Sequence, residues 1–256
     1  MDDHGPQEAI HVADGVIETA RRIRVSQTSG STWSKVPAQR VLSVEAVMDV
    51  ARSILQPDLC SQQRAQIDDV DAVRARESSL LATLLARTPD ASLLSRIARL
   101  PGDATPLGLA HRALAQAAAN TSAEKIEREF FNLFIGIGRG ELLPYGSYYL
   151  TGFLNERPLA RLREDLRAHS IERADEQLEP EDHGAILCEI MAELAGDQLA
   201  TDARLQQQFF EKHLASWIGR FFADLEQADS ADFYRYVGTV GRQFMEIETE
   251  AFALLA

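Results

Sequence analysis

Cysteine is scarce in this 256-residue chain, and long apolar runs are absent from it. The two cysteines, Cys60 and Cys188, lie far apart and form no CxxC pair. Such a pattern argues against both a disulfide framework and a zinc ribbon. No stretch of 18 apolar residues is present, so we expect neither a transmembrane helix nor stable insertion into a membrane. The sequence therefore suits a reducing, cytoplasmic location.

Positive charge is also in short supply. The chain has 26 Lys and Arg against 39 Asp and Glu, and its formal net charge is -13. Binding to nucleic-acid phosphates needs clustered Lys and Arg, so we expect no nucleic-acid partner. A chain of this charge is better suited to a partner or peptide that carries positive charge.

Signatures of catalysis and of cofactor binding are missing as well. No HExxH motif occurs, and Ser147 does not lie in a G-x-S-x-G elbow. Gly136, Gly138 and Gly140 resemble a phosphate-binding loop, but they follow a predicted helix instead of a strand. A helix end that needs a positive φ is the simpler interpretation, and weak nucleotide binding by this loop is the alternative. We therefore expect no enzyme activity, no cofactor and no metal.

Alternating polarity of the kind that predicts strands does not stand out, whereas apolar residues recur at helical spacing. The sequence predicts an all-α fold, a single-domain helical bundle over residues 41–256. Residues 1–40 are predicted to form an N-terminal extension that is partly a flexible arm, because residues 26–39 are rich in Ser, Thr and Gly. Helices are expected over residues 7–24, 43–56, from Ser61 or Asp69 to 88, 89–100, 106–119, 121–136, from 147, 157–169, 180–195, 201–225 and 231–252.

The stretch LEPEDHGAIL, residues 178–187, places carboxylates beside an imidazole. Pro180 suits the first position of a helix, and Glu181 and Asp182 would then lie in its first turn, near the positive end of the macrodipole. A metal site on a helix wants ligands four residues apart, but Leu187 follows His183 at that spacing. A surface for recognition at an exposed helix start is favoured. The alternative is a helical metal-dependent hydrolase that uses Asp182 and His183.

A second stretch, LLPYGSYY, predicts a turn followed by a helix. Pro144 and Gly146 stand at the second and fourth positions of a type I turn, and Ser147 is placed to cap the helix that follows. The aromatic residues Tyr145 and Tyr148 flank this turn. Aromatic side chains and a glycine beside a turn form a plausible surface for docking a peptide.

Four blocks of the sequence resemble, in the same order, the TorD/DmsD/NarJ family of redox-enzyme maturation chaperones. They are EREFFNLFIG, LLPYGSYYLTG, EPEDHGAILCEIMAELA and the stretch from FFEKHLASW to GRQFMEIE, which lie at residues 127–136, 142–152, 179–195 and 209–248. The combination of the first and third blocks is the specific part of the resemblance, which spans roughly residues 42–250. In one respect the chain departs from the pattern, because many relatives have Glu where Gly146 stands.

The resemblance implies an all-helical TorD-like fold without catalysis of its own. It further implies a cytoplasmic chaperone that binds the twin-arginine signal peptide, the immature catalytic subunit, or both, of a molybdenum or tungsten oxidoreductase. The chaperone would hold its client for cofactor insertion before export or assembly. Residues 136–149 are most similar to relatives that serve formate dehydrogenases. Either a monomer or a dimer with exchanged helices would fit such a bundle.

The resemblance also suggests which residues contact the client. They are Pro144, Tyr145, Gly146, Ser147, Tyr148, Glu179, Asp182 and His183. Residues 172–183 contain six acidic side chains and one arginine, a local charge of -5, and carboxylates pair well with arginine. Aromatic side chains and a neighbouring groove would take the apolar part of the peptide.

The chain carries an arginine pair of its own, Arg21 and Arg22. The stretch VSQTSGSTWSK that follows is too polar for the apolar region of an export signal, so we do not expect one. Two interpretations remain, an ordinary arm or a segment that occupies the client groove in the same or a neighbouring chain.

Overall fold

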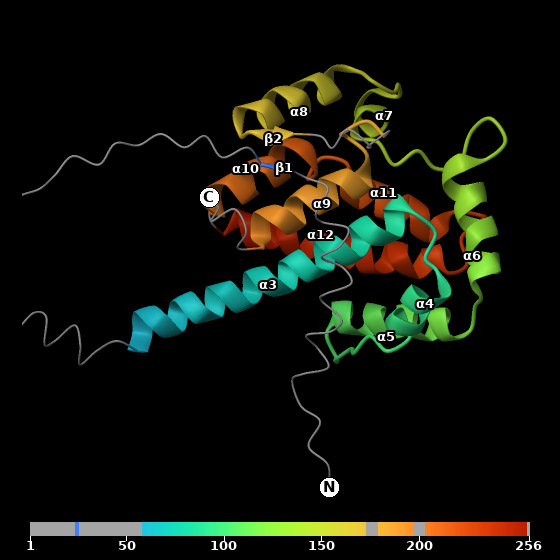
Figure 1. Ribbon diagram of the computed structural model, residues 1–256, viewed down its shortest axis with the longest axis horizontal. Helices are drawn as coiled ribbons and strands as arrows, with labels where there is room; N and C mark the ends of the chain where they lie inside the picture. Colours follow the sequence, from blue (N-terminus) through green and yellow to red (C-terminus); the bar gives the residue numbers. More distant parts are fainter. Residues whose placement is uncertain (1–23, 26–57, 173–178, 197–202, 255–256) are drawn as a thin grey trace, which may run out of the picture.

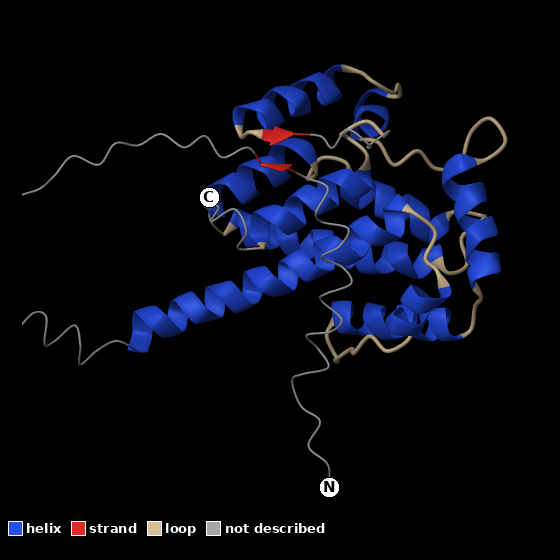
Figure 2. Cartoon of the chain, in the orientation of Figure 1, coloured by secondary structure: helices blue, strands red, loops and turns tan. Residues whose placement is uncertain are grey.

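The computed structural model describes residues 24–25, 58–172, 179–196 and 203–254, and this part of the chain is helical apart from two short strands (Figures 1 and 2). The all-α fold class is thereby confirmed. The helices expected over residues 7–24 and 43–56 lie almost wholly outside the described residues, as does the boundary expected at residues 40–41. Within the described helices, none is long and apolar enough to cross a membrane.

The described helices follow one another with short connections. They are α3 (Asp58–Ala86), α4 (Ala91–Ile97), α5 (Pro106–Ala119), α6 (Ala123–Phe130), the π-helical turn η1 (Phe131–Ile135), α7 (Gly146–Thr151), α8 (Arg157–Ala168), α9 (Gly184–Ala195), α10 (Ala203–His213), α11 (Ile218–Gln227) and α12 (Tyr234–Ala253). Local capping explains some of the starts. The Asp90 carboxylate accepts the Leu93 N–H at α4, and the Thr105 hydroxyl accepts the Gly108 N–H at α5.

The centre of the bundle is formed by α9, α11 and α12. Helix α3 packs along α9, and α12 packs on α11 and α5. Their facing sides bury an apolar core that includes Leu84, Leu187, Phe221 and Val237, each 0–1% exposed. Figure 1 shows α7 and α8 on one side of this centre and α4 and α5 on the other, while the first half of α3 projects beyond the other helices.

Two differences from the predicted helices affect the candidate site. Helix α9 begins at Gly184 and not at Pro180, so Glu181 and Asp182 lie in the preceding loop. The helix expected over residues 201–225 is interrupted at residues 214–217, between α10 and α11. The buried Trp217 lies at this break, and its indole N–H donates to the His213 carbonyl over 2.7 Å.

The two strands are β1 (Arg24–Val25) and β2 (Ile171–Glu172). They pair antiparallel, with Arg24 opposite Glu172 and Val25 opposite Ile171. The sequence did not predict this pair, because segments of two residues show no measurable alternation. Strand β2 packs next to α8.

Candidate functional site

The turn before α7 and the loop before α9 are joined by backbone hydrogen bonds. The Gly146 N–H donates to the Asp182 carbonyl over 2.9 Å, and the Gly184 N–H donates to the Pro144 carbonyl over 2.7 Å. Between these two bonds, Tyr145 and His183 pair as an isolated antiparallel β-bridge. The structure therefore brings together the two stretches that the sequence singled out. We name residues 144–148 and 179–184 together the turn–loop unit.

Asp182 stabilises the start of α7 from outside that helix. Its Oδ2 accepts the Ser147 N–H over 2.7 Å, where a negative charge also meets the positive end of the helix dipole. Both residues are buried, with Asp182 3% and Ser147 0% exposed. Ser147 was expected to cap α7 with its own side chain, and that expectation is wrong because the Asp182 carboxylate takes this role. Within the described part of the chain, Ser147 Oγ and Asp182 Oδ1 are buried without a hydrogen-bond partner.

His183 is the N-cap of α9. Its Nδ1 accepts the Ala185 N–H over 3.1 Å, so the ring's other nitrogen carries the proton in the neutral form. The ring meets the Tyr145 ring edge to face, with centroids 5.0 Å apart. Burial lowers the pKa of His183 to about 4, although Glu179 and Asp182 act in the opposite direction. His183 is therefore neutral at pH 7.

The exposure that we expected for this helix start is found only at its edge. Asp182 and His183 are buried, so neither presents a free charge to a ligand in this arrangement. Glu179 is exposed, and its Oε2 accepts the Tyr145 hydroxyl over 2.5 Å. Burial and the Glu179 carboxylate raise the pKa of the Tyr145 phenol. Glu181 is ion-paired with Arg163 over 2.7 Å.

The turn rests on the indole of Trp217. A Cβ atom added at Gly146 would lie 3.2 Å from Trp217 Nε1, which is tighter than ordinary packing. The sequence did not predict this contact of Trp217 with the turn. The small residue pair Gly146 and Ser147 was the available signal, because small residues mark places where the backbone approaches a large side chain closely.

Exposed apolar side chains gather in the sequence around the turn. Of the eleven exposed large apolar side chains among the described residues, six lie between residues 131 and 154. They are Phe131, Ile135, Ile137, Leu150, Phe153 and Leu154, which we name the apolar rim. Ile137 is 99% and Phe153 70% exposed. The Leu142 N–H donates to the Leu133 carbonyl over 2.8 Å and so holds the turn next to η1. Figure 1 shows α7 and the loop after η1 at the same end of the molecule.

Tyr148 lies between the turn and the loop that follows η1. The Arg139 guanidinium donates to its hydroxyl over 2.6 Å and lies 5.1 Å from the ring centroid. Gly136 and Gly138, on either side of Ile137, have φ values of 61° and 89°. The positive φ expected at the end of the helix is thus confirmed at Gly136, where other residues would be strained.

The hydrolase alternative finds no support in this geometry. Asp182 and His183 are buried and committed to backbone N–H groups of α7 and α9. Among residues whose placement is described, no group of three or more His, Cys, Asp or Glu side chains is arranged to hold a metal ion. A hydrolytic site would need an accessible metal with an open coordination position.

Comparisons with known proteins agree with these motifs. The family model described as "Nitrate reductase delta subunit" matches residues 100–223. The Chaperone protein TorD of Vibrio atlanticus (strain LGP32) is 27% identical over 139 residues, which are 50% of this chain and 65% of that protein. The Chaperone protein TorD of Vibrio cholerae serotype O1 (El Tor) is 30% identical over 131 residues, which are 48% of this chain and 60% of that protein.

The chain thus spans about 60–65% of the length of these curated relatives. A solved structure of a redox enzyme maturation protein from Archaeoglobus fulgidus is 21% identical, with a TM-score of 0.45, and covers 68% of this chain and 93% of that one. At that score the likeness adds nothing to the fold, which rests on the helices described above. The family model and the curated relatives confirm the resemblance to the TorD/DmsD/NarJ family.

Proposed function

We propose that this chain is a cytoplasmic chaperone for a molybdenum or tungsten oxidoreductase. It binds the twin-arginine signal peptide, the immature catalytic subunit, or both, and holds them for cofactor insertion before export or assembly. The observation that supports this most is the turn–loop unit, in which two family motifs are locked together beside the exposed apolar rim. Similarity to the TorD chaperones supports the class of activity.

The buried and exposed parts of the turn–loop unit have different tasks in this proposal. Asp182 and His183 position the backbone, because their polar atoms face α7 and α9. Glu179 and Tyr148 lie nearer the surface, and the Glu179 carboxylate is available to an arginine of the client. The apolar rim takes the apolar stretch that follows the arginines in such a peptide.

The client that we favour is a formate dehydrogenase, which is the client class that the resemblance of residues 136–149 suggests. Tagged chain is expressed in its own host and the co-purified proteins are identified by mass spectrometry. We expect the catalytic subunit of a formate dehydrogenase to be enriched together with its uncleaved signal peptide. Enrichment of another molybdenum or tungsten enzyme would replace this client and keep the proposed function.

Peptide binding tests the function directly. The probe is a fluorescent synthetic peptide with two adjacent arginines before an apolar stretch of about 15 residues. A second peptide has glutamines in place of the arginines. We expect the arginine peptide to bind more tightly, and we expect Glu179→Gln and Phe153→Ser each to weaken it by about tenfold, since a charge-assisted hydrogen bond or a buried phenyl ring contributes on the order of 1.5 kcal/mol.

Leu109→Ser is the matched control. Leu109 is 50% exposed on α5, which Figure 1 shows on the far side of the central helices from α7. This variant should bind the peptide like the unaltered chain, and circular dichroism should show the same helix content for all variants. Equal affinity for the arginine and glutamine peptides would contradict the proposed recognition of the two arginines. Equal weakening by Leu109→Ser would show that the apolar rim is not the specific surface.

A further inference from the structure

The pairing of β1 with β2 is a long-range connection that the sequence motifs leave unexplained. It joins Arg24–Val25 to Ile171–Glu172 across nearly 150 residues. One partner, β2, is held by the bundle. Ile171 packs against the apolar core, and the chain turns into β2 through Ser170, which has a φ of 56° and donates its N–H to the Arg167 carbonyl at the end of α8. The bundle thus presents a fixed strand edge.

The other partner, β1, belongs to the N-terminal extension. A pair of two-residue strands is marginal by itself, so β1 stays on the edge only as long as its local concentration is high. Because β1 is tethered to the same chain, that effective concentration is on the order of millimolar. A separate peptide with the same chemistry can therefore take its place.

Charge and direction connect this edge to the turn–loop unit. The register places Arg24 opposite Glu172, and residues of opposite charge favour such opposed positions in a strand pair. Because the strands are antiparallel, β1 begins beside the end of β2, where the chain continues toward Glu179. The seven residues from Glu172 to Glu179 span at most about 25 Å. In sequence, the segment that ends in β1 is basic, with arginines at positions 21, 22 and 24.

We propose that the edge of β2 is a docking site for an extended basic segment, and that Arg24 and Val25 of the same chain are its resident occupant. The basic segment of a client displaces these residues by pairing with the same edge. The edge itself and its occupant are independent of the proposed function. The competition between this resident segment and a client rests on the proposed function. Arg21 and Arg22 lie outside the described residues and enter only through their charge.

Trypsin tests the resident occupant in the full chain. The Arg24–Val25 bond lies inside the strand pair, and a paired strand does not fit a protease active site. We expect cleavage after Arg24 to be at least tenfold slower than cleavage after Lys35, which lies in the same extension, as followed by mass spectrometry. Glu172→Gln should speed cleavage after Arg24 and leave cleavage after Lys35 unchanged. Equal rates at both sites in the unaltered chain would overturn the docking.

A second experiment tests whether the edge accepts a peptide in trans. The probe is a fluorescent peptide of residues 17–30 of this chain. Full-length Arg24→Glu should bind it about tenfold more tightly than the unaltered chain, because the resident segment no longer competes. Lys35→Glu makes the same charge change elsewhere in the extension and should not alter binding.

The two proposals fail in different ways. If the three chains bind the peptide of residues 17–30 equally, or none binds it, the docking edge is refuted whatever the client peptide does. If Arg24→Glu tightens binding of the peptide of residues 17–30 but no twin-arginine peptide binds any variant, the docking edge stands and the chaperone assignment falls. Protection of Arg24–Val25 that grows with protein concentration would overturn the same-chain form of the proposal.

Discussion

Asp182 and His183 are neighbours in the chain, but they serve two different helices. The Asp182 carboxylate accepts an N–H at the start of α7, and the His183 imidazole accepts one at the start of α9. Each satisfies a donor that the first turn of a helix leaves unpaired. The two residues therefore fix the relative position of the helices on either side of the turn–loop unit. In the proposed function they contribute through the geometry that they impose on Tyr145 and Glu179, and not through contact with a client.

Neutral, buried His183 makes stability depend on pH. Its pKa is about 4 in the folded chain and about 6.5 in the unfolded chain. Between these values the unfolded chain binds a proton that the folded chain does not, so stability falls as the pH drops from 6.5 toward 4. The full slope for one group is about 1.4 kcal/mol per pH unit. We expect urea unfolding at pH 7, 6 and 5 to show this loss in the unaltered chain.

His183→Asn is the matched variant, since Asn is also a good N-cap but does not titrate in this range. The variant should show a shallower loss of unfolding free energy between pH 6.5 and 5. His111 and His213 are present in both proteins, and their contributions cancel in the comparison. Identical pH slopes for the two proteins would mean that His183 is not buried in its neutral form.

At the scale of elements, α12 is tied to α6 by one carboxylate. Glu129 at the end of α6 accepts N–H groups of Asp232, Phe233 and Tyr234, over 2.8, 3.1 and 2.6 Å. The side chain is 8% exposed. Burial raises the pKa of Glu129, and the three N–H donors act against that rise. Because these donors lie at the start of α12, the charge also meets the positive end of its dipole.

Glu129→Gln should destabilise the chain by about 1–3 kcal/mol. The amide keeps a single acceptor oxygen, whereas the carboxylate uses both of its oxygens on the three donors. Glu127→Gln, two residues away and exposed on α6, should change stability by less than about 0.5 kcal/mol. The unfolding free energies of both variants are measured in urea at pH 7. Equal stability of the two variants would refute the role of Glu129 as an anchor.

The sequence predicted elements well where the signals were local. Helix α5 was expected over the residues that it occupies, 106–119, and Pro106 lies at its first position. The start of α9 was misplaced, because Pro180 looks like a first helical residue while its neighbour Asp182 bonds to α7. The break before Trp217 was missed for the same reason. Trp217, at this break, packs next to Gly146, 71 residues earlier, and periodicity does not register such contacts.

The sequence predicted which residues form the candidate site, but not which of their side chains are exposed. The resemblance selected the two stretches that the structure joins, because blocks shared within a family mark positions that depend on one another. Hydrogen bonds between distant residues decide which side chains face outward, and the sequence does not show these bonds. Asp182 found a buried donor at Ser147, whereas Glu179 remained at the surface with Tyr145. The boundary at residue 40, the client and the state of association stay predictions.

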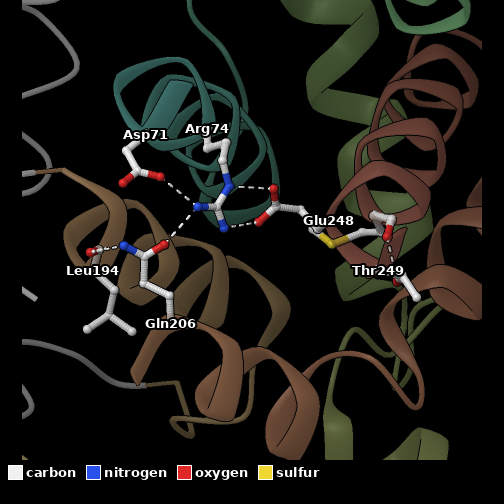
Figure 3. Close-up of polar contacts among 7 residues, drawn as sticks. Asp71, Arg74, Leu194, Gln206, Glu248 and Thr249 are labelled. Carbon is white, nitrogen blue, oxygen red and sulfur yellow. Dashed lines mark hydrogen bonds and ion pairs between the residues drawn. The ribbon is translucent and has the colours of Figure 1, made fainter. Parts of the chain in front are cut away.

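Across the whole molecule, three helices meet at the guanidinium of Arg74, and a fourth is joined to it through Gln206 (Figure 3). From α3 it donates through Nε and Nη2 to both oxygens of Glu248 on α12, each over 2.7 Å. Its Nη1 donates to Asp71 and to Gln206 on α10, each over 2.8 Å. The Gln206 amide donates in turn to the Leu194 carbonyl of α9 over 3.0 Å. The network fixes the projecting helix α3 to the bundle.

Breaking this pair from one side should be costly. Glu248 is 2% exposed, so Arg74→Met leaves a buried carboxylate without its cation and should lower the unfolding free energy by about 3–5 kcal/mol. Glu248→Met should have a similar cost. The double variant should lose less than the sum of the two, because two apolar side chains of similar length remain.

Glu246→Gln is the control. Glu246 pairs with Arg242, but its side chain is 55% exposed, so we expect the unfolding free energy to change by less than about 0.5 kcal/mol. Urea unfolding of the four variants gives the coupling energy. Additive losses would show that Arg74 and Glu248 stabilise the chain independently of one another.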